Sequence, residues 1–175
     1  MLDSQVQLNN QSLQTAYRGN IEKVKLLIEK NEADINCQGF ANYTPLMNAL
    51  FGKQLEVAKY LIDQKADINL RSNLNYTALH LASEYGYLDI VQSLVANGAD
   101  INCKNEFGST PLNYAIRNNQ LNIVSCLTSA GATVTPEIMK TKNAQAIKQI
   151  ACSRVFHFYD AGVSENQDAI NNLES

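Results

Sequence analysis

The apolar positions of this chain follow the period of a helix in short segments, with polar turns between them. In one well-defined stretch, a first helix is predicted to begin after Thr77 and to end at Gly86, because threonine caps helix starts and glycine favours helix ends. A second helix is predicted from the helical spacing of the residues that follow: Leu88, Ile90, Val91, Leu94 and Val95. The pattern therefore predicts pairs of short helices.

The same arrangement returns every 33 residues. Thr44, Thr77 and Thr110 each stand two positions before a leucine, and alanine recurs near the end of each unit, at positions 33, 66, 99 and 132. One helix pair of this size cannot cover its own apolar side, so such units must stack on one another. The period therefore predicts a continuous stack of similar helix pairs.

Three segments carry a family resemblance. Thr44-Pro45-Leu46, Thr77-Ala78-Leu79-His80-Leu81-Ala82 and Thr110-Pro111-Leu112 resemble the Thr-Pro-Leu-His-x-Ala motif of ankyrin repeats. Gly98-Ala99-Asp100-Ile101-Asn102 resembles the typical end of the same repeat, and the resemblance covers roughly residues 5–142. It implies an all-α ankyrin-repeat solenoid in which helix-turn-helix units are joined by β-hairpin loops.

The register divides the chain into a repeat domain and a tail. We predict an ankyrin-repeat domain over residues 1–152, with four repeats at roughly 5–38, 39–71, 72–104 and 105–135 and a shortened capping repeat at 136–152. The first repeat lacks the motif, since Gln11-Ser12-Leu13-Gln14 stands in its place, and it needs one inserted residue before Ala33. Its outer face has no neighbour, so polar residues are expected there: Gln14, Arg18, Lys23 and Lys25. Residues 1–10 are expected to add a short helix or to fray.

Residues 153–175 form a C-terminal tail that we expect to be partly docked or disordered. Its first part is too apolar for a solvated chain end: Val155, Phe156, Phe158 and Tyr159. Two interpretations stay open. The aromatic residues dock on the last repeat as an extra cap, or they form a linear motif for a partner or for a second copy of the chain.

Composition and charge narrow the classes of partner. The chain has 175 residues, of which 45% are hydrophobic and 18% charged, and its formal net charge is −3. With 14 Lys and Arg against 17 Asp and Glu there is no overall positive field, so nucleic acid is not an expected partner. No apolar run suits a membrane span and no secretory leader opens the sequence. We expect no membrane association and a cytoplasmic protein, with a nuclear location or export into a host cell as alternatives.

Residue types that carry catalysis or bind metals are sparse. For His80 the ankyrin resemblance implies a structural hydrogen bond near the capping threonine, and His157 lies in the aromatic part of the tail. Cys37 and Cys103 stand two units apart, too far for a disulfide or a shared metal. We therefore expect no catalytic residue, no metal site, no cofactor and no enzymatic activity. An enzyme with a site around His157 is the less favoured alternative.

Ankyrin-like stacks generally bind proteins, and the resemblance implies contact on the concave side, through the hairpin tips and the exposed side of the first helices. Mapping the repeat gives a candidate protein-binding set rich in aromatic residues, which are enriched at binding hot spots: Phe40, Tyr43, Phe51, Arg71, Leu74, Tyr76, Glu84, Tyr85, Lys104, Glu106, Phe107, Arg117 and Asn118. An alternative is that Leu74 and Phe107 staple adjacent hairpins. Tyr43 and Tyr76 are expected to form one stacked column.

These observations favour a non-enzymatic protein–protein interaction module, an adaptor, scaffold or inhibitor that binds one protein partner. The chain is expected to be a monomer, with self-association through the tail as the alternative. A second hypothesis is an exported effector of an intracellular microbe that uses the same surface, because lysine and asparagine are favoured over arginine. The resemblance also marks Asn69 and Asn102 as candidate modification sites, since they lie in a context in which ankyrin asparagines are hydroxylated.

Overall fold

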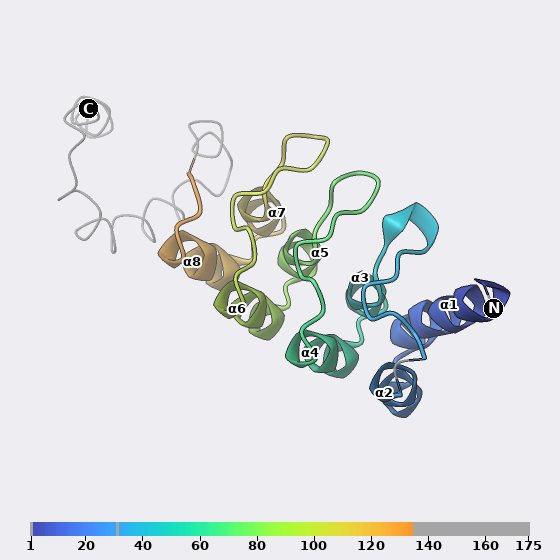
Figure 1. The fold of residues 1–175 in the computed structure, drawn as a ribbon. Helices are drawn as coiled ribbons and strands as arrows, with labels where there is room; N and C mark the ends of the chain where they lie inside the picture. Colours follow the sequence, from blue (N-terminus) through green and yellow to red (C-terminus); the bar gives the residue numbers. More distant parts are fainter. Residues whose placement is uncertain (1, 31, 135–175) are drawn as a thin grey trace, which may run out of the picture.

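The computed structural model describes residues 2–30 and 32–134, and the elements in these ranges are all helical (Figure 1). The eight α-helices form four consecutive pairs: α1 (Leu2–Arg18) with α2 (Ile21–Glu29), α3 (Pro45–Phe51) with α4 (Leu55–Asp63), α5 (Ala78–Tyr85) with α6 (Leu88–Ala96), and α7 (Pro111–Arg117) with α8 (Leu121–Ser129). A 3₁₀ helix, η1 (Phe40–Asn42), lies in the first hairpin. The predicted capping repeat at 136–152 and the tail at 153–175 lie outside the described residues.

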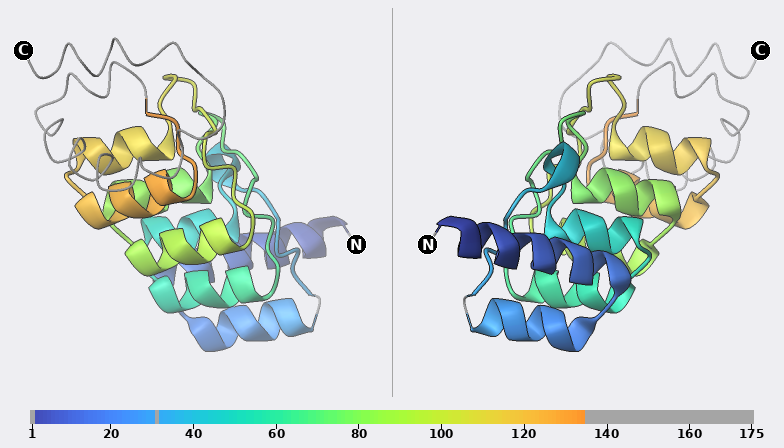
Figure 2. Two further views of the ribbon diagram at one scale, coloured as in Figure 1. Left: turned by 90° about the vertical axis from the view of Figure 1, so that its left-hand side faces the viewer. Right: turned by 90° about the vertical axis from the view of Figure 1, so that its right-hand side faces the viewer.

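The pairs stack in two helical layers (Figures 1 and 2). α1, α3, α5 and α7 pack side by side in one layer, and α2, α4, α6 and α8 form the other. Eleven large side chains in this stack are almost fully buried: Leu46, Met47, Leu50, Leu61, Ile62, Leu79, Ile90, Leu94, Leu112, Ile123 and Leu127. The predicted all-α class is confirmed.

The loops between units project from the stack as hairpins, although within the described ranges no residue of theirs pairs as a β-strand (Figure 1). One backbone hydrogen bond closes each hairpin: Gly39 N to Tyr43 O (3.0 Å), Ser72 N to Tyr76 O (2.9 Å) and Asn105 N to Ser109 O (3.0 Å). Adjacent hairpins are joined in the same way: Asn73 N donates to Ala41 O (2.9 Å) and Glu106 N to Leu74 O (3.1 Å). The hairpin tips and the exposed side of α1, α3, α5 and α7 form a surface that we call the hairpin face.

An asparagine at the end of each of the first three units ties that unit to the next. Asn69 Oδ1 accepts a hydrogen bond from the backbone N–H of Asp100 (2.9 Å), and Asn69 Nδ2 donates to the carbonyl oxygen of Gly98 (3.2 Å). Equivalent bonds join neighbouring units: Asn36 Oδ1 to Asp67 N (2.8 Å) and Asn102 Oδ1 to Thr133 N (2.8 Å). Because these bonds satisfy the backbone of each following turn, they fix the register of the stack. We call them the asparagine ladder.

The first unit departs from this repeat because α1 is 17 residues long, whereas α3 and α7 have 7 residues and α5 has 8. Its first turns stand where a later unit has a hairpin. Gln5 Nε2 donates to the carbonyl oxygen of Glu32 (3.0 Å), and Asn9 Oδ1 accepts from the backbone N–H of Asp34 (3.0 Å). The Asn9 side chain thus accepts the hydrogen bond from the backbone N–H of Asp34, as the asparagines of the ladder do for the equivalent N–H groups of later units. From Leu2 onward, residues that we expected to form a short helix or to fray begin one long helix.

Lys53, between α3 and α4, has a positive φ of 61°, where the third unit has Gly86 with a φ of 84°. We expect Lys53→Gly to raise the free energy of unfolding by about 0.5–1 kcal/mol, because a side chain strains left-handed backbone. Urea unfolding measures this change. Gln92→Gly, at an exposed position inside α6, is the matched control and should lower the free energy by about 1 kcal/mol. A loss of stability in both variants would show that the turn is not strained.

Asn69→Ala removes one member of the asparagine ladder and leaves the Asp100 N–H and the Gly98 carbonyl without this partner. We expect the free energy of unfolding to fall by about 1–2 kcal/mol in urea unfolding. Asn122→Ala, at an exposed position on α8, is the control and should cause no loss. If the two variants are equally stable, the ladder does not hold the units together.

Candidate functional site

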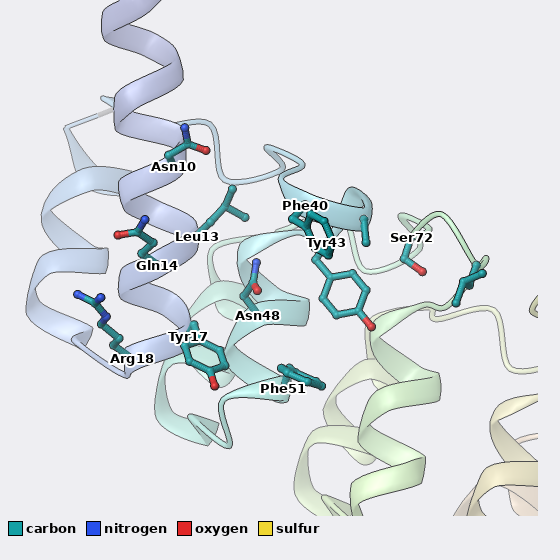
Figure 3. Close-up of a pocket in the computed structure, with 12 residues that line it drawn as sticks. Asn10, Leu13, Gln14, Tyr17, Arg18, Phe40, Tyr43, Asn48, Phe51 and Ser72 are labelled. Carbon is teal, nitrogen blue, oxygen red and sulfur yellow. The ribbon is translucent and has the colours of Figure 1, made fainter.

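A pocket of about 670 Å³ opens on the hairpin face between α1, η1 and α3 (Figure 3). Its lining comes from the first two units and from the tip of the second hairpin: Asn10, Leu13, Gln14, Tyr17, Arg18, Phe40, Ala41, Tyr43, Asn48, Phe51, Ser72 and Leu74. The exposed lining surface is mainly apolar. A concave site of this size and character suits a group of apolar side chains or an organic ligand.

Aromatic rings form the inner walls of this pocket. The ring centroid of Phe51 lies 6.2 Å from that of Tyr17 and 6.2 Å from that of Tyr43. Phe40 at the rim is 97% exposed, Phe51 50% and Tyr17 47%. Large apolar side chains gathered at one exposed place mark a contact surface.

The first hairpin approaches α1 closely because it carries a glycine. A Cβ atom added to Gly39 would lie 2.5 Å from Leu13 Cδ1, so the Leu13 side chain would have to move to make room for a larger residue. At the tip, Ala41 and Asn42 have φ angles of 55° and 58°, and Tyr43 N donates to Phe40 O (3.2 Å). Two successive positive φ angles are typical of the tight turns of hairpins. This turn leaves Phe40 in solvent beside the pocket.

A second cluster lies on the third and fourth units. The hydroxyl groups of Tyr76 and Tyr114 share a hydrogen bond, and Asn105 Nδ2 donates to the Tyr114 oxygen (2.9 Å). Burial, and next this hydrogen bond, raise the pKa of the Tyr76 hydroxyl above its ordinary value. The guanidinium of Arg117 lies 5.3 Å from the centre of the Tyr114 ring.

The charges of the hairpin face are mixed. Arg71 forms an ion pair with Asp100 (3.8 Å). Burial raises the pKa of the half-buried Glu84 carboxyl, while the positive charge of Arg117 acts in the opposite direction. Lys104 and Glu106 lie exposed on the third hairpin. The surface therefore offers both signs of charge beside its apolar pocket.

His80 is fully buried and joins two units. Its Nδ1 accepts from the backbone N–H of Thr77 (3.2 Å), so the ring proton stands on Nε2, which donates to the carbonyl oxygen of Ser109 (3.1 Å). Burial lowers the pKa of His80, and the Ser109 hydrogen bond opposes that effect. Cys103 Sγ lies 3.8 Å from Nδ1, but burial raises the pKa of this thiol. These contacts are those of a structural histidine and not of an activated nucleophile.

In residues 2–30 and 32–134, His, Cys, Asp and Glu side chains form no group of three that could hold a metal ion. Cys37 and Cys103 are free thiols. Burial, with the charge of Asp34, raises the pKa of Cys37 to about 12. None of the described helices combines the length and the apolar character that crossing a bilayer requires.

Comparison with known families identifies the architecture. A model of the family "Ankyrin repeats (3 copies)" matches residues 12–105, 67–138 and 84–154. The chain belongs to the ankyrin-repeat family. A search of curated proteins found no match. Ankyrin repeats are generally protein–protein interaction modules, and proteins built from them typically lack enzymatic activity.

The ankyrin fold brings some of the predicted binding residues together and separates others. Phe40, Tyr43, Phe51 and Leu74 all line the pocket. Outside it, the remaining predicted residues lie from the end of the second repeat to the first helix of the fourth: Arg71, Tyr76, Glu84, Tyr85, Lys104, Glu106, Phe107, Arg117 and Asn118. Phe107 is 68% exposed and its side chain is therefore not a buried staple.

The expected stacking of Tyr43 on Tyr76 is wrong. Tyr43 makes an edge contact with Phe51, and Tyr76 packs on His80 and Tyr114, with centroids 5.6 and 5.5 Å away. The two tyrosine rings therefore pack on different partners and not on each other.

Sequence reasoning missed the half of the pocket that α1 supplies: Asn10, Leu13, Gln14, Tyr17 and Arg18. Gln14 and Arg18 are exposed, as expected of an end repeat, but they line the pocket of the hairpin face. The sequence did contain a sign of this site. Once the one-residue insertion before Ala33 is allowed for, Tyr17 falls at the same repeat position as Phe51, which was in the predicted binding set. Tyr114 was also missed, since its repeat position holds Leu81 in the third unit.

The two modification candidates, Asn69 and Asn102, belong to the asparagine ladder. In Asn102, Oδ1 accepts from Thr133 N (2.8 Å) and Nδ2 donates to Gly131 O (3.1 Å). Both side chains are exposed, yet both ends of each amide are engaged. An enzyme that hydroxylates them would have to open these bonds, and the modification stays a prediction.

The capping histidine predicts a pH dependence. Because burial lowers the pKa of His80 in the folded state, the unfolded chain takes up a proton first, and stability is expected to fall as the pH drops below about 6.5. In the fourth repeat Asn113 takes the equivalent place, and its Oδ1 accepts from Thr110 N (2.7 Å). In the His80→Asn variant, the asparagine side chain should therefore still accept the hydrogen bond from Thr77 N, but it has no proton to gain or lose in this pH range. We expect a flatter dependence of unfolding free energy on pH in this variant, measured by urea unfolding between pH 5.5 and 8; parallel curves for both proteins would contradict this role.

Proposed function

We propose that the protein is a non-enzymatic adaptor, scaffold or inhibitor that binds a protein partner in the pocket between α1 and the first hairpin. The observation that carries this proposal is the apolar pocket of about 670 Å³ with exposed aromatic residues around it. Exposed rings contribute most when a partner covers them, because they bury a large apolar area with little loss of rotamer entropy.

The rest of the hairpin face supports a partner of mixed polarity. Beyond the pocket, the Phe51 ring lies 6.3 Å from Tyr85, which lies 5.8 Å from Tyr87, so the aromatic surface continues onto the third repeat. Arg71, Lys104 and Glu106 are exposed at the hairpins and would form the polar rim of an interface.

Partner capture tests the proposal. We expect Tyr17→Ala, Phe40→Ala and Phe51→Ala each to weaken binding of the captured partner by tenfold or more, because hot-spot side chains contribute at least about 1.4–2 kcal/mol. The partner is identified by quantitative pull-down with mass spectrometry, and its affinity is then measured with each purified variant.

Leu26→Ala is the matched control, since Leu26 on α2 has the same exposed fraction as Tyr17, 47%, but does not line the pocket. It should leave the affinity unchanged. If the three pocket variants bind as tightly as the Leu26 variant, the proposed site is wrong. An exported effector would use the same surface, and a translocation assay with residues 160–175 deleted tests export separately.

A further inference from the structure

One carboxylate of the hairpin face has no partner. Glu84 is half-buried in the last turn of α5, and within the described ranges its side chain makes no hydrogen bond and no ion pair. An acidic side chain is unfavourable at this place, because the C-terminal end of a helix carries partial negative charge. In the fourth unit the same repeat position holds a basic residue, Arg117. Glu84 therefore does not stabilise the helix that carries it.

The Glu84 carboxylate lies next to the aromatic wall of the pocket. Burial, and after it the negative charge of Glu84, raise the pKa of the Tyr43 and Tyr85 hydroxyls, so both residues are within electrostatic reach of the carboxylate. Tyr43 lines the pocket, and the Tyr85 ring contacts Phe51, which lines it too (centroids 6.3 Å apart). The faces of such rings are negative and attract cations, as the carboxylate does.

A partner that covers the pocket would also cover this charge. The positive charge that acts on Glu84 is that of Arg117, but its guanidinium lies 5.3 Å from the centre of the Tyr114 ring and forms no ion pair with the carboxylate. Water solvates the exposed part of Glu84 in the free protein. Removing that water leaves a buried charge unpaired, which is unfavourable unless the partner brings a positive charge of its own.

Arginine suits this position better than lysine. Its planar guanidinium can donate two hydrogen bonds to a carboxylate and stack on an aromatic ring, and it is less strongly hydrated than an ammonium group. The Tyr85 ring, next to Glu84 in the chain, is half-buried and held between Phe51 and Tyr87, with ring centroids 6.3 and 5.8 Å away. The ring is therefore in place before a partner arrives.

We propose that Glu84 binds an arginine of the partner, whose guanidinium pairs with the carboxylate and stacks on the Tyr85 ring. A large apolar side chain of the same partner fills the pocket between α1, η1 and α3. This inference rests on the proposed function, because the pocket brings the partner to this surface. It adds the chemistry of the partner, an apolar residue with an arginine beside it.

Selection from a displayed library of random peptides, with the full chain as target, tests the inference. We expect the wild type to select peptides rich in arginine and in large apolar residues. Glu84→Gln should lose the enrichment of arginine and keep that of apolar residues, whereas Glu84→Arg should enrich aspartate and glutamate instead. Glu56→Gln, which removes an exposed carboxylate from α4 in the other helical layer, is the matched control and should select as the wild type does.

A double-mutant cycle then measures the pairing. In the tightest wild-type peptide the arginine is replaced by citrulline, which has nearly the same shape but no charge. We expect this replacement to weaken binding about tenfold for the wild type and for Glu56→Gln, and by less than about twofold for Glu84→Gln.

Urea unfolding separates binding from a structural role. Because Glu84→Gln breaks no hydrogen bond or ion pair and removes negative charge from the end of α5, the variant should be at least as stable as the wild type. A loss of stability would show that Glu84 supports the fold through the charge of Arg117, and it would overturn the inference.

Three results of the selection would also overturn the inference: no arginine enrichment by the wild type, enrichment that Glu84→Gln retains, or lysine in place of arginine. The proposed function would still stand if Tyr17→Ala, Phe40→Ala and Phe51→Ala weaken binding of the selected peptides. If these three variants bind normally while citrulline still weakens binding to the wild type, the arginine site stands and the proposed pocket is wrong.

Discussion

No helix pair of this protein can cover its own apolar side, and the rest of the structure depends on that constraint. Ala49, Ala82 and Ala115 are fully buried in the first helices of successive units, where small side chains let neighbouring helices approach. Stacking also determines which polar groups pair between neighbouring units. The asparagine ladder and the bonds between hairpins run along the stack, so each unit completes the backbone hydrogen bonding of its neighbour.

The candidate site arises where the repeat is broken. In the later units a hairpin precedes the first helix, whereas the first unit has additional turns of α1. The pocket lies between this helix and the first hairpin, where Gly39 packs against the Leu13 side chain. The later units repeat one another, and the pocket forms at the first unit, where the structure departs from that repeat. The departures from the repeat therefore coincide with the candidate site.

Much of the fold could be predicted because its determinants are local. Threonine caps and aspartate turns act within three residues of chain, as in the Thr44 and Asp67 hydrogen bonds, so a 33-residue period is enough to place them. The long α1 could not be predicted in this way. Its first turns are held by Glu32 and Asp34, more than twenty residues away, and their own sequence is only weakly patterned. The pocket was missed for the same reason, since Tyr17 and Phe51 meet only after two units have stacked.

The three Thr-capped first helices differ in how their caps respond to acid. In the second and fourth units no titratable side chain takes part, since the hydroxyl of Thr44 accepts from Met47 N and the amide of Asn113 serves Thr110. The third unit alone depends on an imidazole, and that imidazole also bonds to the hairpin of the fourth. Stability in a linear array is a sum of unit terms and nearest-neighbour terms. Protonation of His80 therefore loosens the junction between the third and fourth units rather than the whole array, and in acid the fourth helix pair would be the first described unit to lose the support of its neighbour.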